Sequence, residues 1–282
     1  MGAALSAVFS FCVLGAVLAW VYFRRFRPAL PPIGVFNDGD VALMAAIIVV
    51  IPYVYLALPL WTVVLFLGAG FLSALYFTLQ PILPSPWAAG PVAALLVGGD
   101  IAIALTQGVA GWPFQLANDL VLIVVIVGAT NLWAQSGMKA RHVALLTAGL
   151  TVYDVVATWR LSVMNDLVER LSHIPLLPVL TWGTPGHGLA VGLGDLIIAG
   201  VFPLVMRKAF GHKAGALALG VGLLVIGGTL ALLATGTVKG TVPAMVGLGP
   251  AVLLQYAVWR RLRPERTTRQ YLQAEPLARL AS

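Results

Sequence analysis

The feature that most constrains this chain is a stretch of 98 residues, Val41–Met138, that carries only two formal charges, Asp100 and Asp119. Soluble domains are about one quarter charged, whereas this chain is 10% charged and 60% hydrophobic. Apolar runs of this length, interrupted only by Gly, Pro and small polar residues, are typical of consecutive membrane-spanning helices. The sequence therefore excludes a cytosolic enzyme and predicts a polytopic membrane protein.

At about 20 residues per span, the apolar segments predict an all-α fold with nine transmembrane helices. Only Pro52 and Pro59 separate the second and third segments, so these two are also compatible with one broken span. The expected spans are 3–23, 41–59, 60–79, 91–110, 119–135, 143–163, 187–206, 214–234 and 240–259.

The positive charges are distributed unevenly between the two sides of the predicted bundle. Of the 17 Lys and Arg residues, all follow odd-numbered spans except Arg160, Arg170 and Lys239. Because Lys and Arg are enriched in cytoplasmic loops, we expect the N-terminus outside and the C-terminus in the cytoplasm. This bias explains the net charge of +7 without a nucleic-acid partner.

Three carboxylates fall inside predicted spans, namely Asp100, Asp154 and Asp195. A carboxylate at the bilayer centre costs roughly 2.5–3.5 kcal/mol, so each needs a partner or a function. For Asp100 we expect a structural hydrogen bond to Gln107 or Asn131, or a place on a water path. Asp119, at the start of the fifth span, suits a helix N-terminus and receives no function.

Asp154 and Asp195 are expected to meet at a similar depth in adjacent antiparallel spans. Gly188, Gly192, Asp195 and Ala199 would form one helical stripe that allows close approach of another backbone. Two carboxyls at hydrogen-bond distance share a proton, as in aspartic proteases. From the aspartates alone, however, a proton or cation relay of a transporter is the favoured interpretation, and purely structural contacts stay open.

Three short motifs change that balance. They are Tyr153-Asp154 in the sixth span, Gly192-Leu193-Gly194-Asp195 in the seventh, and Pro243-Ala244-Met245 at the start of the ninth. In this order they resemble the YD, GxGD and PAL motifs of the presenilin and signal peptide peptidase family of intramembrane aspartyl proteases. Met in place of Leu is a volume-conserving change. The specific resemblance covers residues 150–255.

The spacing of Lys239, Pro243 and Pro250 looks closer to signal peptide peptidases than to presenilins, as does the expected orientation. The short loops look like a prokaryotic, stand-alone member in the plasma membrane, with no insertion for self-cleavage. One membrane domain, 1–282, is expected. It comprises scaffold spans within 1–135, catalytic spans within 143–260 and a basic cytoplasmic tail, 261–282, along the anionic inner leaflet.

The resemblance implies a presenilin-like aspartic endopeptidase that cleaves transmembrane helical peptides, such as single-span proteins or signal peptides, within the lipid bilayer. It implies no metal and no cofactor, and it predicts no oligomeric state. Asp154 and Asp195 would be the catalytic pair, and Tyr153 would lie near the cleft. The residues expected to shape the cleft are Gly192, Leu193, Gly194, Pro243, Ala244 and Met245. A proton-coupled transporter that uses the aspartates as a relay is the alternative, and a non-cleaving relative would share the same motifs.

Cleavage of a transmembrane helix requires local unwinding, because the amides of the helix are already paired. The glycines of 192–194 would leave space for an extended backbone, and Pro243 would interrupt the ninth span. The segment Leu176–Trp182 is expected to be either an edge strand that receives the unwound substrate or an interfacial loop. No HExxH motif or membrane-embedded serine motif indicates a zinc or serine protease.

Overall fold

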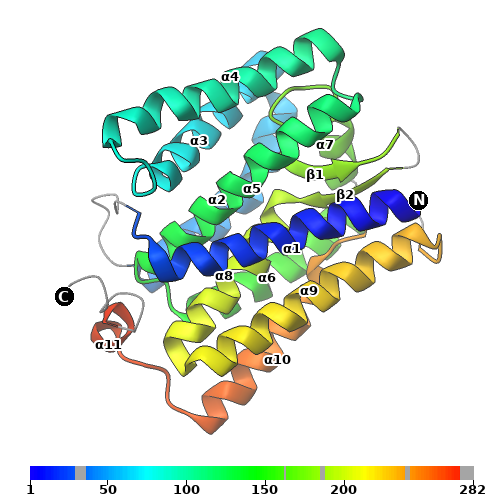
Figure 1. The fold of residues 1–282 in the computed structure, drawn as a ribbon. Coiled ribbons are helices and arrows are strands. Elements are labelled where there is room, and N and C mark those ends of the chain that lie inside the picture. Colours follow the sequence, from blue (N-terminus) through cyan, green and yellow to red (C-terminus); the bar gives the residue numbers. More distant parts are fainter. Residues whose placement is uncertain (29–35, 162, 185–187, 239–241, 274–282) are drawn as a thin grey trace.

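The computed structural model describes residues 1–28, 36–161, 163–184, 188–238 and 242–273. Its helices form one bundle with a small two-stranded sheet at one end (Figure 1). Lys239, the predicted starts of the seventh and ninth spans at 187 and 240, and the end of the basic tail lie outside the described residues. In chain order the elements are α1 (Gly2–Arg25), α2 (Asp38–Ala57), α3 (Leu60–Leu79), η1 (Pro86–Ala88), α4 (Ala89–Gln107), α5 (Trp112–Gln135), α6 (Ala140–Trp159), α7 (Val163–Leu171), β1 (Val179–Trp182), β2 (Leu189–Gly192), α8 (Leu193–Phe210), α9 (His212–Ala234), α10 (Met245–Leu262) and α11 (Thr268–Leu272).

Seven helices in the described part of the chain are long and apolar enough to cross a membrane: α1 to α6, with η1 joined to α4, and α9. The prediction of a polytopic helical membrane protein is therefore confirmed at this level. Helices α8 and α10 occupy the two remaining predicted spans, but α8 contains three charged residues and α10 ends in two arginines. The count of nine spans stays a prediction.

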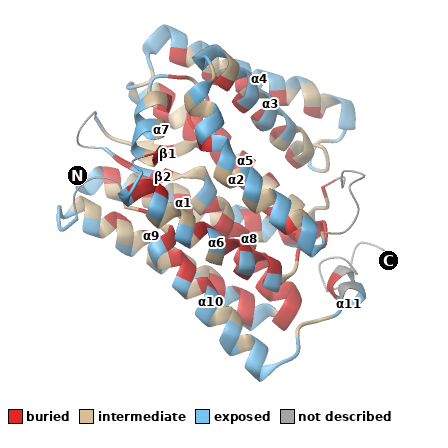
Figure 2. Cartoon of the chain, turned by 180° about the vertical axis from the view of Figure 1, so that it is seen from behind, coloured by how far each residue is buried: buried red, intermediate tan, exposed pale blue. Residues whose placement is uncertain are grey.

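Helix α5 is the centre of the bundle. It contacts α1, α3, α4 and α8. Of the residues in its 18-residue apolar stretch, 61% are buried, against 11% for the corresponding stretch of α2 at the periphery. The burial pattern in Figure 2 agrees with this arrangement, with wide exposed faces on the outer helices. Since those exposed faces are mostly apolar, a lipid environment is the solvent they suit.

Helices α2 and α3 are separate, and each is long and apolar enough to cross a membrane by itself, which favours two spans over one broken span. The chain leaves α2 at Leu58, whose backbone is extended, and Pro59 caps α3. Arg170 of α7 donates to the carbonyl groups of Leu56 and Leu58 and thereby satisfies the end of α2. The short helix α7 was not predicted from the sequence.

The sheet corrects the expected start of the seventh span. Strands β1 and β2 pair antiparallel, with Val179 opposite Gly192 and Trp182 opposite Leu189. Residues 189–192, expected to be helical, are therefore extended, and α8 begins only at Leu193. The predicted helical stripe through Gly188 and Gly192 is wrong. Strand pairing is favoured over a helix because Gly188 and Gly192 lower the helix propensity of this segment and allow close approach of a neighbouring backbone.

The described part of the basic tail packs back on the bundle. Tyr271 of α11 is fully buried, and its ring lies 3.7 Å from Lys208 Nζ. The Lys208 ammonium group also donates to the carbonyl of Ala134 at 2.6 Å. A buried lysine is stabilised by such contacts, so α11 helps to close this end of the bundle.

Candidate active site

A cavity of about 560 Å³ lies where the sheet meets α6, α8 and the loop before α10. Both predicted catalytic carboxyls line it, as do Thr158, Gly192, Pro243 and Ala244. The rest of its wall consists mostly of apolar side chains from α7, the two strands and α9. The cavity therefore combines two acidic groups with an otherwise apolar surface, a combination suited to an apolar ligand.

Asp154 and Asp195 approach the cavity from different elements. Asp154 lies near the C-terminal end of α6, whereas Asp195 is in the first turn of α8, where acidic residues suit the helix dipole. The two side chains are close enough to repel each other when both are charged. The expected juxtaposition agrees with the structure, although Asp195 begins its helix instead of lying deep within it. Their catalytic role stays a prediction.

Thr158 is a site residue that the motifs did not indicate. It lies one helical turn after Asp154, and its hydroxyl donates to Asp154 Oδ1 at 3.3 Å. The i, i+4 spacing was the available signal, since side chains four residues apart share a helix face. Thr158 therefore restrains the orientation of one carboxyl without closing the cavity.

The glycine motif forms the turn from β2 into α8. Gly192 caps α8 in an extended conformation, and a Cβ there would lie 3.3 Å from Asp195 Oδ2. Leu193 donates its backbone N–H to the carbonyl of Pro178 at 3.0 Å. Gly194 is exposed, and a Cβ there would meet nothing within 4 Å. Of the two glycines, only Gly192 lines the cavity, so it alone leaves room beside the carboxyl.

The proline motif lines the same cavity as Gly192, just before and at the start of α10. Pro243 and Ala244 line the cavity, and the backbone amide of Met245 lies beside the Asp154 carboxyl. Helix α10 approaches α6 closely at Gly249, where a Cβ would lie 1.9 Å from Thr151 Oγ1. Pro243 was expected to interrupt the ninth span, but in the described residues it precedes the helix, which begins at Met245. The glycine contact holds that helix start against α6.

Tyr153 is not among the residues that line the cavity. Its ring lies near Tyr53 of α2, and its buried hydroxyl has no hydrogen-bond partner among the described residues. Tyr153 is thus placed between α6 and α2, beside the site and not within it. Leu193, Gly194 and the Met245 side chain are also outside the lining.

The free edge of the sheet belongs to β2, not to β1 as expected. In an antiparallel pair, every second residue of a strand bonds to the partner strand. Since Leu193, just after β2, bonds to Pro178, the residues of β2 that bond to β1 are Val191 and Leu189. The amide of Gly192 and both backbone groups of Ala190 then point away from β1. Both residues line the cavity, and no further strand of the described chain pairs with this edge.

The other two intramembrane aspartates have backbone partners. Asp100 Oδ2 accepts from the amide of Leu176 at 2.9 Å, and Asp119 Oδ1 accepts from that of Thr181 at 3.1 Å. The structural role expected for Asp100 agrees with this, but the expected partners, Gln107 and Asn131, are wrong. Asp119 lies eight residues into α5 rather than at its start. Neither residue lines the cavity.

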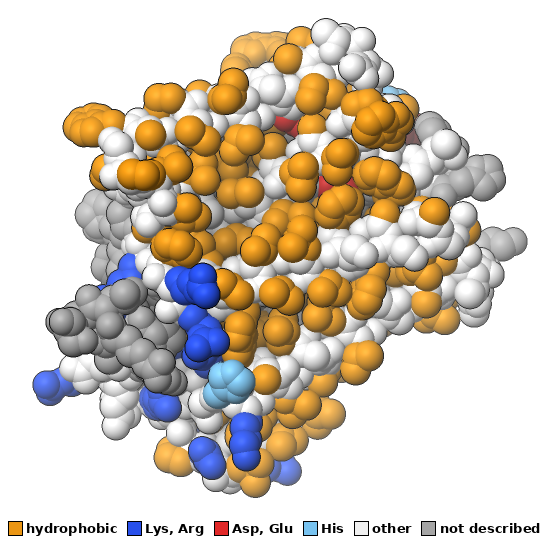
Figure 3. All heavy atoms as spheres, in the orientation of Figure 1, with side chains coloured by type: hydrophobic (Ala, Val, Ile, Leu, Met, Phe, Trp, Pro, Cys, Tyr) orange, Lys and Arg blue, Asp and Glu red, His pale blue; other side chains and the backbone are white. Residues whose placement is uncertain are grey.

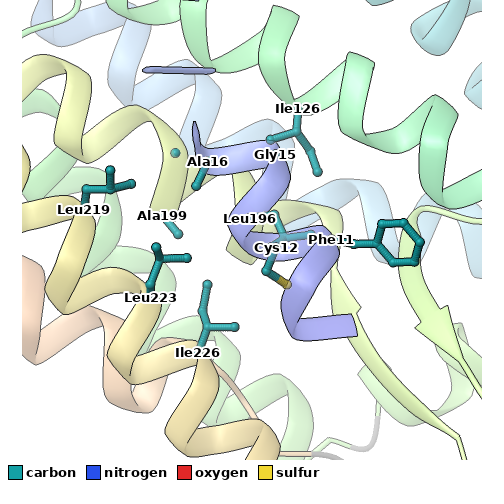
Figure 4. A pocket seen from close by; sticks show the side chains of 11 residues that line it. Phe11, Cys12, Gly15, Ala16, Ile126, Leu196, Ala199, Leu219, Leu223 and Ile226 are labelled. Carbon is teal, nitrogen blue, oxygen red and sulfur yellow. The ribbon is translucent and has the colours of Figure 1, made fainter. Parts of the chain in front are cut away.

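A second cavity lies between α1, α5, α8 and α9 (Figure 4). It holds about 10 Å³, and its walls are apolar apart from the thiol of Cys12. A space of this size and polarity holds no more than one water molecule and offers it no adequate partners. This cavity is a packing defect without reactive groups.

A groove of about 590 Å³ lies at the other end of the bundle, between the starts of α2 and α6 and the end of α10. Its two acidic residues are partnered. Arg141 Nη2 lies 2.8 Å from Asp38 Oδ1, and the Tyr256 hydroxyl donates to Glu265 Oε2 at 3.0 Å. This groove therefore has no pair of facing carboxyls.

Within the described ranges, no three His, Cys, Asp or Glu side chains cluster closely enough to hold a metal ion. The comparison with models of known protein families finds no match, and no curated protein sequence matches the chain significantly. The functional interpretation consequently depends on the geometry of the cavity and on the motifs.

Proposed function

We propose that this protein is a nine-span intramembrane aspartyl protease, similar to signal peptide peptidases. The observation that carries the proposal is one cavity, inside an apolar bundle, with two carboxyls and an open strand edge. Asp154, Asp195, Gly192 and Pro243 all belong to the three motifs, and they reach that cavity from α6, from the junction of β2 and α8, and from the loop before α10.

In the proposed reaction, one aspartate is ionised and the other is protonated. The ionised carboxylate takes a proton from a water molecule, whose oxygen attacks the scissile carbonyl carbon. The protonated carboxyl donates its hydrogen bond, and then its proton, to the carbonyl oxygen. When the tetrahedral intermediate collapses, the carboxyl that took the water proton gives it to the departing amide nitrogen, the other carboxylate takes a hydroxyl proton from the diol, and the C–N bond breaks. Thr158 holds the Asp154 side chain in orientation.

The substrate is a transmembrane peptide that unwinds locally and pairs with the free edge of β2. The backbone groups of Ala190 and Gly192 on that edge replace the hydrogen bonds that the substrate helix loses. The apolar wall around the carboxyls favours apolar residues next to the cut bond. This assignment moves the substrate edge from β1, where the sequence placed it, to β2.

The cut is expected near the outer face of the membrane. Lys and Arg gather at one end of the molecule (Figure 3), where α1, α8 and α10 all end in basic residues. Asp195 lies at the opposite end of α8, 13 residues before Lys208, or roughly 20 Å along the helix. If the basic end faces the cytoplasm, the carboxyl pair lies in the outer half of the bilayer.

A proton-coupled transporter is less well supported. A relay needs ionisable groups in a chain, yet Asp100 and Asp119 each bind a backbone amide outside the cavity. The two remaining carboxyls face one space and not a path of successive sites. The arrangement suits acid–base chemistry on a bound backbone better than transport.

The proposal is tested by a cleavage assay in liposomes with several single-span peptides and mass-resolved products. Wild-type protein is expected to cut within the apolar stretch, and Asp154→Asn and Asp195→Asn are expected to cut nothing. Asp100→Asn is the matched control, because it changes an intramembrane carboxyl but keeps an oxygen for the Leu176 amide. Continued cleavage by Asp195→Asn would refute the assignment. A folded wild type that cuts no peptide but carries protons would favour the transporter.

A further inference from the structure

Three buried polar side chains on α5 bind one strand. Gln115, Asn118 and Asp119 are 6%, 0% and 0% exposed, and their spacing of three and four residues puts them on one helix face. Polar groups inside an apolar bundle are costly unless they are hydrogen-bonded. All three find their partners outside α5 in the segment that contains β1, apart from one longer bond from Gln115 to Ala110.

Together the bonds cover every second residue of the segment from 177 to 183. Gln115 makes two bonds to Gly183, accepting from its amide at 3.1 Å and donating to its carbonyl at 2.8 Å. Asp119 accepts from the amide of Thr181. Asn118 donates to the carbonyl of Leu177 at 3.0 Å and, at 3.4 Å, to that of Val179.

These partners are alternate residues, 177, 179, 181 and 183, whose backbone groups point away from β2. The α5 side chains therefore occupy the position that a third strand would take. An open edge of β1 in an apolar environment would leave several unpaired amide and carbonyl groups. We call Gln115, Asn118 and Asp119 the α5 ladder.

The α5 ladder is connected to the candidate active site through the sheet. Strand β1 pairs with β2, β2 ends at Gly192, and Asp195 follows within the first turn of α8. A two-stranded sheet alone is only marginally stable, so an external anchor is required to hold its position. Helix α5, which is the most buried of the seven candidate spanning helices, is that anchor.

We infer that Gln115, Asn118 and Asp119 are positioning residues that hold the free edge of β2 in place against the carboxyl pair and so determine which substrate bond is cut. The inference rests on the proposed protease function and goes beyond it by assigning the choice of the cut bond to α5. None of the three residues touches the cavity, so each acts through β1 and β2. A displacement of about 1 Å at a reacting centre costs on the order of 100-fold in rate.

The test compares Asn118→Ala with Asn131→Ala. Asn131 is equally buried on the same helix, and its amide donates to the carbonyl of Ala19 in α1 instead of to the strand. Asn118→Ala is expected to lower kcat about 10- to 100-fold and to spread the products over adjacent bonds. Asn131→Ala is expected to lose similar thermal stability while it keeps the single wild-type cut.

A second pair of variants separates shape from hydrogen bonding. Asp119→Leu removes the acceptor for the Thr181 amide, whereas Asp119→Asn keeps one. We expect Asp119→Leu to spread the cuts, and Asp119→Asn to bring them back to the wild-type bond. If Asp119→Leu does not fold, the Asn118→Ala comparison still decides.

Amide hydrogen exchange over residues 176–193 supplies a readout that needs no activity. Faster exchange in Asn118→Ala, with wild-type exchange in Asn131→Ala, is the expected result. Unchanged exchange and a single cut in Asn118→Ala would overturn the inference, and so would an equal spread of products in Asn131→Ala. If the wild type cuts no peptide while the exchange result holds, the protease proposal fails and the anchoring of the sheet by α5 stands.

Discussion

The molecule contains two regions with intramembrane aspartates, and the region around α4, α5 and β1 differs from the region between α6 and α8. In the first, Asp100 and Asp119 each accept from a backbone amide and lie outside the cavity. In the second, Asp154 and Asp195 line one cavity and are close enough to interact electrostatically, although Asp154 also accepts from the backbone amide of Met245. A buried carboxyl whose only contact is an amide completes the backbone, whereas two carboxyls that share one open space are available for chemistry.

The largest expected effect is on the reactive pair. Asp154→Ala and Asp195→Ala should each reduce cleavage by about 1,000-fold or more, because each removes one half of the acid–base pair. In detergent, the melting temperature of Asp195→Ala should stay close to that of the wild type, since no described group donates a hydrogen bond to Asp195. Asp154→Ala should melt at a lower temperature, because it removes the acceptor for the Thr158 hydroxyl and the Met245 amide. Activity above a tenth of wild type in either variant would remove the distinction between the two regions.

The reverse pattern is expected for Asp100. Asp100→Ala leaves the amide of Leu176 without its acceptor, at a residue with a positive φ of 58°. The loss of stability should be about 1–3 kcal/mol, measured by thermal or denaturant unfolding. Asp100→Asn is the control and should lose less, because it keeps an oxygen. Equal losses in the two variants would show that the hydrogen bond is not what Asp100 supplies.

Two glycines sharpen the comparison within the reactive region. Gly192→Ala should lower kcat about 10-fold, because the new Cβ lies 3.3 Å from Asp195 Oδ2 and shifts that carboxyl. Gly194→Ala should cost less, because a Cβ there meets nothing within 4 Å and alanine favours the first turn of α8. Steady-state cleavage of one peptide by both variants gives the answer. A larger loss for Gly194→Ala would show that the exposed glycine touches the substrate.

The smallest effect is expected at the far end of the bundle. Asp38→Asn weakens an exposed ion pair with Arg141, and such pairs contribute less than about 1 kcal/mol. Unfolding in low and high salt should show a small difference that salt removes. Cleavage should be unaffected, because this groove is separate from the cavity with the two aspartates. A marked loss of cleavage in Asp38→Asn would show that this groove and the cavity with the two aspartates are coupled.

Much of the fold was predictable, since the positions of the long helices follow from apolar length alone. The sequence was less informative where two structures compete. Residues 188–192 are apolar and glycine-containing, and such a run suits a helix end as well as a buried strand. The pairing with β1, 7 to 13 residues earlier in the chain, decides between them. The contact of Thr158 with Asp154 could have been predicted from the i, i+4 spacing. The contacts of the α5 ladder could not, because their partners lie more than 55 residues away in the sequence.

The sequence by itself determined that this chain belongs in a membrane, because hydrocarbon requires long apolar segments and tolerates few charges. It also indicated which two aspartates to examine, through three motifs. Only the tertiary structure decided which groups each aspartate contacts. Asp119 and Asp195 are the same residue type in similarly apolar surroundings, and the difference is one backbone amide within hydrogen-bond distance. That amide belongs to a strand from another part of the chain, and nothing local to either residue specifies it.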